Sequence, residues 1–212
     1  MPLITAVIPS PKREGRFDVV VDGKAVGVLS LDVIERLGLH VGTEYTDRVA
    51  DALAVEGARL RTFDRALDML AFRGRATREL RLALLRKGEE EANVDHALER
   101  LLSMGLLDDA AYSRQYAHSK IMGPGFSRRR LQAELARRGV ARDIADAAIA
   151  EALAEDDVDA DAILERVATR KLRSLERLDE PTRRRRLYEF LARRGYDSDD
   201  IRRVMDRLLT TH

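Results

Sequence analysis

The fold is decided by three short stretches of one kind: LRLALLRKG at residues 80–88, LQAELARRG at 131–139 and LYEFLARRG at 187–195. In each stretch, leucines stand eight and four residues before a glycine, so both lie on one face of a helix. The glycine can take the left-handed backbone conformation that commonly ends a helix. The three glycines are 51 and 56 residues apart. This spacing predicts a tandem repeat of roughly fifty residues, with room for three helices in each copy.

The sequence around these stretches has the pattern of amphipathic helices. Positions six, nine, ten, thirteen and fourteen after each glycine are apolar in all three copies. Before the first copy, Leu60, Phe63, Leu67 and Leu70 are spaced three and four residues apart. The patterns predict helices over residues 44–73, 77–87, 91–104, 109–122, 127–138, 141–153, 157–178, 182–194 and 198–209.

The N-terminal part reads differently. Residues 16–30 are rich in valine and are broken by Asp22-Gly23, a pair suited to a type I′ turn, so they predict a β-hairpin. Residues 3–8 are a candidate third strand, whose pairing the sequence does not fix. Ser30 can cap a short helix after the hairpin. We expect a small β-rich cap that leans on the helices that follow it.

Together these patterns predict a mainly α fold, with tandem three-helix repeats that form an elongated, curved solenoid after a small N-terminal β-rich segment. The Gly123-Pro124-Gly125 loop should break the helices of the second repeat and could act as a hinge. A stack of repeats exposes a long surface without a deep pocket, which favours an extended macromolecular partner. The expected parts are the β-rich cap at 1–42, repeat 1 at 43–107, repeat 2 at 108–154 and repeat 3 at 155–212.

Nothing in the sequence indicates a catalytic centre. The chain has no cysteine, no G-x-x-x-x-G-K-[ST] phosphate loop and only four scattered histidines. The acidic pairs Asp108-Asp109 and Asp156-Asp157 stand where helices should begin, so helix capping explains them better than metal binding or acid–base chemistry. We therefore expect no catalytic residue, no cofactor and no metal. An enzyme with an unrecognised site stays a third hypothesis.

The sequence also carries no targeting or membrane signal. Residues 1–15 contain three prolines beside Lys12 and Arg13 and lack an apolar stretch long enough for a signal peptide. No later window approaches about 18 uncharged apolar residues. Because no cysteine suggests an oxidising compartment, we expect a cytoplasmic protein without membrane contact.

Charge is abundant and unevenly distributed. The chain has 38 basic and 37 acidic residues, yet every charge between residues 154 and 165 is acidic, while arginines cluster elsewhere. Solvated helix faces with paired charges would explain most such runs. Arginine-rich faces also suit phosphate or acidic protein surfaces, because the planar guanidinium can bind either group through two hydrogen bonds. The residues that we expect to bind a partner are Arg128, Arg129, Arg130, Arg137, Arg138, Arg183, Arg184, Arg185 and Arg186.

A series of short motifs runs in order along the chain. They are Ala66, Leu70, Arg73, Glu79-Leu80, Leu84, Lys87-Gly88, Leu106-Leu107-Asp108-Asp109, Tyr112, Gly125, Leu131, Glu134-Leu135 and Arg138-Gly139-Val140. Together they resemble the bacterial RecX family of recombination regulators. The resemblance covers residues 60–155 well and 156–212 more loosely, whereas residues 1–40 lie outside the family's common core. The chain departs from the family at Ala76, where a serine is usual, and in a slightly long loop before Leu131.

The resemblance implies a non-enzymatic negative modulator of the RecA recombinase, acting in DNA repair, homologous recombination and the SOS response. Such a protein would bind the filament that RecA forms on single-stranded DNA and block its growth, its ATPase and strand exchange. A curved stack with an arginine-rich face would fit a filament groove and bind through several modest contacts. The implied partners are the RecA filament and its single-stranded DNA, with weak direct DNA binding in addition, and the protein itself would be a monomer.

The alternative is a stand-alone helical-repeat protein that binds nucleic acid directly. It predicts tight binding to naked DNA that weakens steeply with salt. The net charge of +1 and the absence of tryptophan weigh against it, because proteins that bind single strands usually stack the bases on aromatic side chains.

Overall fold

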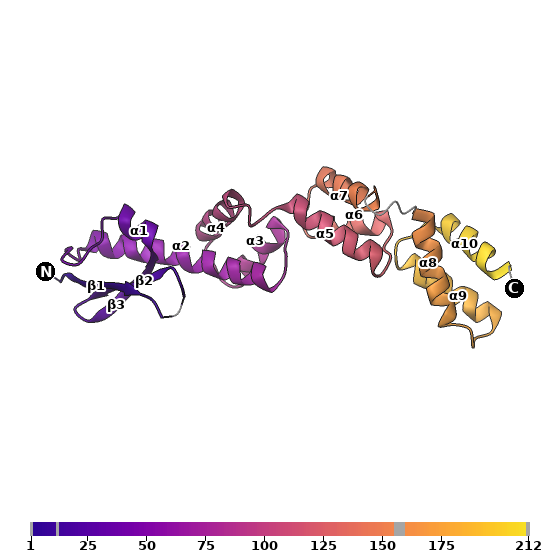
Figure 1. Ribbon diagram of the computed structural model, residues 1–212, viewed down its shortest axis with the longest axis horizontal. Coiled ribbons are helices and arrows are strands. Elements are labelled where there is room, and N and C mark those ends of the chain that lie inside the picture. Colours follow the sequence, from indigo (N-terminus) through magenta and orange to yellow (C-terminus); the bar gives the residue numbers. More distant parts are fainter. Residues whose placement is uncertain (1, 12, 155–159, 211–212) are drawn as a thin grey trace. The chain divides into compact units, whose positions relative to one another are not determined.

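The computed structural model describes residues 2–11, 13–154 and 160–210 (Figure 1). These residues form three strands and ten helices, so the predicted mainly α fold with an N-terminal β-rich segment is confirmed. The chain divides into two compact units, of which unit 1 contains residues 1–74 and 80–106 and unit 2 contains residues 75–79 and 107–212. The predicted limits of the four parts, and the curvature of the stack, stay predictions.

Unit 1 begins with an antiparallel sheet. Asp22 and Gly23 have φ angles of 47° and 76°, the left-handed pair that a type I′ turn requires, so the predicted hairpin is confirmed. The first strand pairs with the second, where Ile4 lies opposite Val21. Ser30 stands at the N-cap of the next helix, but its side chain makes no capping bond. The elements are β1 (Ile4–Pro9), β2 (Arg16–Val21), β3 (Lys24–Ser30) and α1 (Leu31–Arg36), with the strands in the order β1-β2-β3.

The sheet packs against the long helix α2 (Asp47–Phe72), as the sequence predicts. Leu29 from β3, Val33 from α1 and Leu53 from α2 are buried in one apolar cluster. Gly27 lies so close to α2 that a Cβ atom at this position would be 3.4 Å from the Leu53 side chain. This shared core gives a small sheet the support that it would lack alone.

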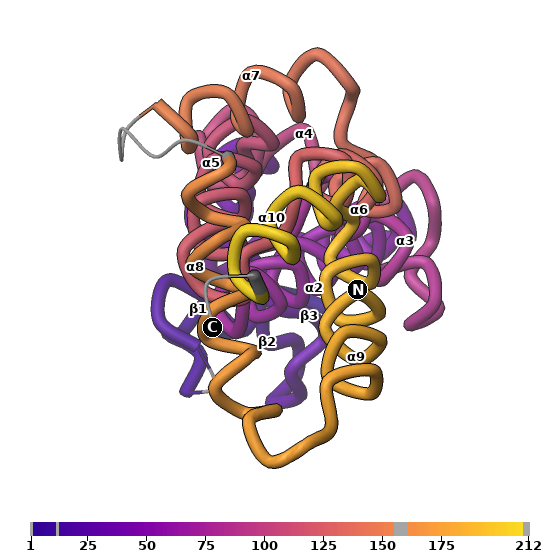
Figure 2. Tube along the Cα trace, turned by 90° about the vertical axis from the view of Figure 1, so that its right-hand side faces the viewer, coloured from indigo at the N-terminus to yellow at the C-terminus, as the bar shows by residue number. Residues whose placement is uncertain are grey.

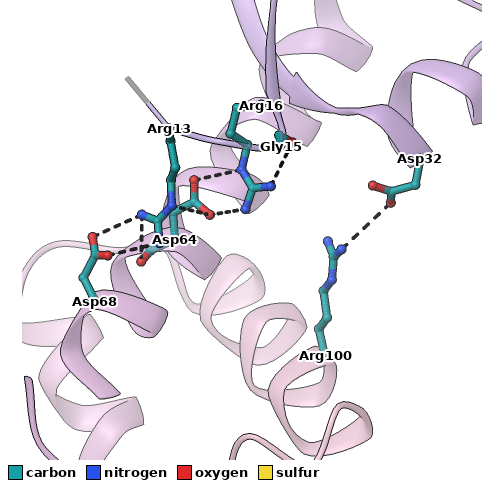
Figure 3. Close-up of polar contacts among 7 residues, drawn as sticks. All are labelled: Arg13, Gly15, Arg16, Asp32, Asp64, Asp68 and Arg100. Atoms are coloured by element: carbon teal, nitrogen blue, oxygen red, sulfur yellow. Dashed lines mark hydrogen bonds and ion pairs between the residues drawn. The ribbon is translucent and has the colours of Figure 1, made fainter. Parts of the chain in front are cut away.

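Two arginines add polar contacts between the N-terminal segment and α2. Figure 3 shows Arg16 of β2 binding both carboxylate oxygens of Asp64, with its Nε atom 3.1 Å from Oδ2. Arg13 lies beside it, with a guanidinium nitrogen 3.1 Å from the carboxylate of Asp68. The Arg16 and Asp64 side chains are only 15% and 18% exposed, so their ion pair is shielded from solvent and should contribute more than an ordinary surface pair.

The remaining helices of unit 1 follow the predicted pattern, with one exception. Helix α2 begins after Thr46, whose Oγ1 accepts a hydrogen bond from the Val49 N–H. Helices α3 (Thr77–Arg86) and α4 (Glu91–Ser103) come next, and Leu80 and Leu84 of α3 are fully buried. Leu102 is the fourteenth residue after Gly88 and is 48% exposed. The fourteenth position after the glycine is therefore apolar without being a core position in α4, since the last turn of this helix reaches solvent.

Unit 2 contains two further sets of three helices around a common core. Leu131 and Leu187, which correspond to Leu80, are likewise fully buried, so the repeat is structural. The helix predicted over 157–178 ends at Arg173, and turns lead from there into the next helix (Figure 2). Its first residues, and the acidic residues between 155 and 159, lie outside the described residues. The helices are α5 (Asp109–Met122), α6 (Arg128–Arg137), α7 (Arg142–Ala154), α8 (Ala160–Arg173), α9 (Glu180–Ala192) and α10 (Ser198–Thr210).

The repeated glycines end helices and, in unit 2, also allow close packing. Gly88, Gly139 and Gly195 have φ angles of 82°, 87° and 85°. A Cβ atom on Gly139 would lie 2.4 Å from Cβ of Arg78, and one on Gly195 would lie 2.7 Å from Cβ of Arg130. Gly88 has nothing within 4 Å. The later two glycines thus each pack against the first turn of the middle helix of the preceding repeat.

The acidic pair at the start of α5 caps two different helices. Asp108 caps α5, as predicted, because its Oδ1 atom accepts hydrogen bonds from the N–H groups of Ala110 and Ala111. Asp109 caps α3 instead, since its Oδ1 lies 2.7 Å from the Thr77 backbone nitrogen. Sequence spacing could not reveal this contact between residues 32 positions apart. The other predicted capping pair, Asp156-Asp157, lies outside the described residues.

Candidate binding surface

The first turn of α6 presents two of the predicted arginines to solvent. The turn is fixed by Ser127, whose Oγ accepts a hydrogen bond from the Arg130 N–H at 3.3 Å. Arg128 and Arg129 are exposed. Arg128 lies 3.9 Å from Asp146, at the outer limit of an ion pair. Arg129 forms no ion pair with any residue that the structure describes, so its charge is free to meet a partner.

Arg130, by contrast, is part of the packing of unit 2. Its guanidinium carbon lies 3.8 Å from the centre of the Phe126 ring, and its Nε is 3.6 Å from Glu134. Nη1 donates a hydrogen bond to the backbone carbonyl of Arg193 at the end of α9. These contacts leave Arg130 a structural residue that joins α6 to the following repeat.

The arginines at the end of α6 also divide between surface and interior. Arg137 is 70% exposed and pairs with Glu134 at 2.9 Å. Arg138 is 26% exposed, donates to Glu79 at 3.2 Å and to the Tyr116 hydroxyl at 3.3 Å, and lies over the Tyr116 ring. Burial acts to lower the pKa of Arg138, but its hydrogen bond to Tyr116 and the charge of Glu79 outweigh burial and raise that pKa. Arg138 is thus held as a cation inside unit 2.

The four arginines of α9 lie on different sides of the helix. Arg183 is half-buried, and its Nε has no hydrogen-bond partner among the described residues. Arg184 pairs with Asp206 of α10 at 2.9 Å. Arg185 and Arg186 are exposed, and within the described chain neither forms an ion pair. Only the last two therefore resemble Arg129 in being exposed without an ion pair, although the charge of Arg185 contributes to lowering the pKa of Asp179 after the hydrogen bonds from Thr182.

The loop at residues 123–125 is held by side chains of α8 and of the segment that follows α9, although its glycines and proline suggest a hinge. A Cβ atom on Gly125 would lie 2.2 Å from Val167 of α8, so the backbone packs directly on that helix. Nearby carbonyls are also well satisfied. Arg166 donates to Ile121 at 3.2 Å, Arg170 to Gly123 at 3.1 Å, Arg194 to Pro124 at 2.6 Å and the Tyr196 hydroxyl to Gly125 at 3.1 Å.

The structure therefore sorts the nine predicted arginines into two groups. Arg130, Arg138 and Arg183 are partly buried in unit 2, and the first two are held there by hydrogen bonds and ring contacts. Arg166 and Arg170 were not predicted from the sequence, although their spacing of four residues in a helical segment places both on one face. The outward-facing group is Arg128, Arg129, Arg137, Arg184, Arg185 and Arg186.

The described residues contain neither a metal-binding cluster nor a membrane-spanning helix. In residues 2–11, 13–154 and 160–210, no three His, Cys, Asp or Glu side chains come together in a way that could hold a metal ion. His40, His96 and His118 are separate, and His212 lies outside the described residues. No helix in this part of the chain is long and apolar enough to cross a membrane.

Family models match all three repeats in order. The model of the first three-helix domain of RecX matches residues 63–101, that of the second matches 108–149, and that of the third matches 158–205. Each match lies within a segment where the structure has the three-helix pattern. The matches leave out residues 1–62 and therefore give no account of the N-terminal sheet.

Curated relatives carry the same family name. The chain is 42% identical over 130 residues to a regulatory protein RecX from Amycolatopsis mediterranei, covering 61% of this chain and 72% of that protein. It is 34% identical over 150 residues to a regulatory protein RecX from Prosthecochloris aestuarii, covering 71% of this chain and 95% of the relative. Both names describe regulatory proteins.

Solved structures show the same fold. A crystal structure of a regulatory protein RecX superimposes with a TM-score of 0.74 at 22% identity, covering 97% of this chain and 100% of the other. A crystal structure of RecX from Lactobacillus salivarius gives a TM-score of 0.55 at 16% identity, covering 71% and 96%. With the three domain matches and the relatives at more than 30% identity, these likenesses show that the chain belongs to the RecX family of regulatory proteins.

Proposed function

We propose that this protein binds the filament that RecA forms on single-stranded DNA and limits its growth, its ATPase and strand exchange, without catalysis of its own. Membership of a family of regulatory proteins supports the regulatory role. The described residues also contain no cluster that could hold a metal. The protein would act by occupying the filament, so its effect would depend on binding alone.

The structural observation that supports this proposal is a pair of exposed arginines at the same position in two repeats. Arg129 and Arg185 stand ten residues before the repeat glycines Gly139 and Gly195, and both are exposed. Within the described residues neither forms an ion pair. Two successive repeats thus present an exposed guanidinium without an ion pair at the same repeat position, which suits binding to a polymer with a repeated anionic surface.

A RecA ATPase titration on single-stranded DNA tests the proposal. We expect the protein to slow DNA-dependent ATP hydrolysis at less than one molecule per RecA, and to hydrolyse no ATP in the absence of RecA. A protein that leaves the RecA ATPase unchanged even at equimolar concentration would contradict the proposed function.

A paired set of variants then tests the surface. Arg129→Glu with Arg185→Glu should raise the concentration needed for half-inhibition by roughly tenfold, because reversed charges at an anionic surface repel. The matched control is Arg142→Glu with Arg202→Glu, since both of these arginines are exposed on the same unit but pair with nearby aspartates. Equal loss in both variants would show that net charge, and not this surface, governs inhibition.

Direct binding to nucleic acid remains the alternative function. The arginines around the loop at 123–125 favour it, because they gather positive charge away from carboxylates. A stand-alone nucleic-acid-binding protein would bind naked single-stranded DNA tightly and would inhibit RecA only at concentrations that coat the DNA. Full inhibition at concentrations far below those that saturate the DNA would exclude this alternative.

A further inference from the structure

A second concentration of positive charge lies at the C-terminal end of α5, apart from the exposed arginines Arg128 and Arg129 of α6 and Arg185 and Arg186 of α9. Arg166, Arg170 and Arg194 each donate one hydrogen bond to a backbone carbonyl between residues 121 and 124. A guanidinium has five N–H donors, so most of the donors on these three side chains are not used by those contacts. Arg166 and Arg170 are exposed.

Aromatic rings hold two further cations in the same region. The Arg194 guanidinium lies 3.6 Å from the centre of the Phe190 ring, and Lys171 Nζ lies 5.2 Å from the same ring. Arg130 stacks on Phe126 and binds the carbonyl of Arg193. Ring stacking fixes the direction of a guanidinium without neutralising its charge. The cluster is therefore ordered, and among its five cations only Arg130 pairs with a carboxylate of the described residues, that of Glu134.

Apart from Glu134 beside Arg130, the carboxylates of the neighbouring helices pair elsewhere. Helix α8 carries both signs of charge, but its Glu165 pairs with Arg207 at 2.8 Å on α10. Across the residues that the structure describes, Arg166, Arg170, Lys171 and Arg194 form no ion pair with a carboxylate. Both acidic residues of α8, Asp161 and Glu165, thus pair with arginines of α10, while Arg166 and Arg170 donate to carbonyls at the end of α5.

The charges of the cluster act on one another. Burial first, and then the positive charges of Arg170 and Arg130, lower the pKa of Arg194 below its ordinary value. Like charges close together raise the free energy of the unliganded protein, and an anion would relieve that repulsion. The helix C-terminus explains why one cation is stabilised there, but it does not require several.

The distribution of exposed apolar side chains indicates which kind of anionic partner this cluster of cations would bind. Among the described residues, ten of the eleven exposed large hydrophobic side chains lie in unit 1, and only Met122 lies in unit 2. Protein interfaces generally need a core of apolar or aromatic side chains. Interfaces with nucleic acid are polar and strongly positive. The surface chemistry of unit 2 therefore fits a nucleic acid better than an acidic protein.

We propose that Arg166, Arg170 and Arg194, supported by Lys171 and Arg130, form a binding site for the phosphodiester backbone of single-stranded nucleic acid. Exposed guanidinium donors of Arg166 and Arg170 bind the phosphates, and Arg194 is positioned by Phe190 to support them. This site adds a DNA contact to the proposed function. That the phosphates come from the DNA within the RecA filament rests on the proposed function. Unit 1, with its exposed apolar side chains, is left to contact protein.

Direct binding of the full chain to a fluorescently labelled oligo-dT strand, without RecA, tests this site. Each phosphate neutralised on a single strand contributes about 0.7 to the slope of log K against log salt. Arg166→Gln with Arg170→Gln should therefore lower that slope by about 1.4, equivalent to about a sevenfold smaller loss of affinity between roughly 50 and 200 mM salt. The matched control, Arg202→Gln with Arg203→Gln, removes the same charge from α10 and should leave the slope almost unchanged.

A second measurement uses the unaltered protein and so does not depend on the folding of a variant. Phenylglyoxal modifies accessible arginines, and mass spectrometry can follow each site. Oligo-dT should protect Arg166 and Arg170 from modification, but not Arg202 or Arg203. An unchanged slope in the Arg166 and Arg170 variant, an equal change in the control, or equal modification with and without DNA would each overturn the site. None of these results depends on RecA, so the proposed function is tested separately.

Discussion

Replacing a repeat glycine by alanine tests whether the glycines only end helices or also allow the repeats to pack. Gly88 and Gly139 have nearly the same backbone, with φ angles of 82° and 87°. Alanine in the left-handed region costs about 1–2 kcal/mol at either position. At Gly88 the added methyl group meets nothing within 4 Å, so we expect no further cost.

At Gly139 the same methyl group meets Cβ, Cγ and Cδ of Arg78 at 2.4, 2.8 and 2.3 Å. The Cβ atom belongs to the first turn of α3 and cannot swing away as the end of a flexible side chain can. Overpacking of this kind costs about 1–3 kcal/mol. Gly139→Ala should therefore lower the free energy of unfolding by about 1–3 kcal/mol more than Gly88→Ala does.

Urea denaturation followed by far-UV circular dichroism measures both changes, each read from the transition of the unit that carries the substitution. A double-mutant cycle isolates the contact, because Arg78→Gly removes all three clashing carbons. In that background Gly139→Ala should cost only as much as Gly88→Ala. If the two single variants lose the same free energy of unfolding, or if the cycle shows no coupling, glycine is needed at position 139 only for its backbone conformation and not for packing against Arg78.

Three further predictions concern single contacts. Asp109→Ala removes the cap of α3 and should lower the free energy of unfolding of unit 2 by about 1 kcal/mol, measured by urea denaturation. Amide hydrogen exchange at the start of α3 should also become faster. Unchanged exchange there would show that Asp109 does not cap α3. Arg16→Gln breaks the ion pair with Asp64 and should cost about 1.5–3 kcal/mol, seen as faster hydrogen exchange in β2; unaltered exchange would contradict this. Burial raises the pKa of Tyr196 to about 12, so the stability gained from its un-ionised phenol is present below the usual pKa of 10.0 and is lost as pH rises towards 12. In an absorbance titration of the folded protein, Tyr196→Phe should remove an ionisation step near pH 12, and an unchanged step there would refute the assignment.

The sequence predicted much of the fold because the deciding signals are local. Leucines eight and four residues before a glycine specify one buried helical face and one helix end, whatever the rest of the chain does. Leu80, Leu131 and Leu187 are all fully buried, as this pattern requires. The Asp22-Gly23 turn was equally predictable, since its conformation depends on those two residues.

The candidate surface was predicted less well, because an arginine run does not show which side chains are already occupied. Arg130 and Arg129 are neighbours in the sequence, yet Arg130 stacks on Phe126 and binds a carbonyl of α9, while Arg129 is exposed. Successive helical residues point about 100° apart, so one of two neighbours commonly faces a packed helix. Which one does so depends on the position of the next repeat.

The sequence by itself determined the helical repeat, its glycine stops and the β-hairpin, since each depends on residues within a few positions of one another. Only the tertiary structure decided that Asp109 caps α3, that Gly139 packs on Arg78, and that Arg166 and Arg170 gather at the end of α5. These contacts join residues between 32 and 61 positions apart. Their partners are set by how complete helices pack, and helix packing is a property of the whole core and not of any one segment.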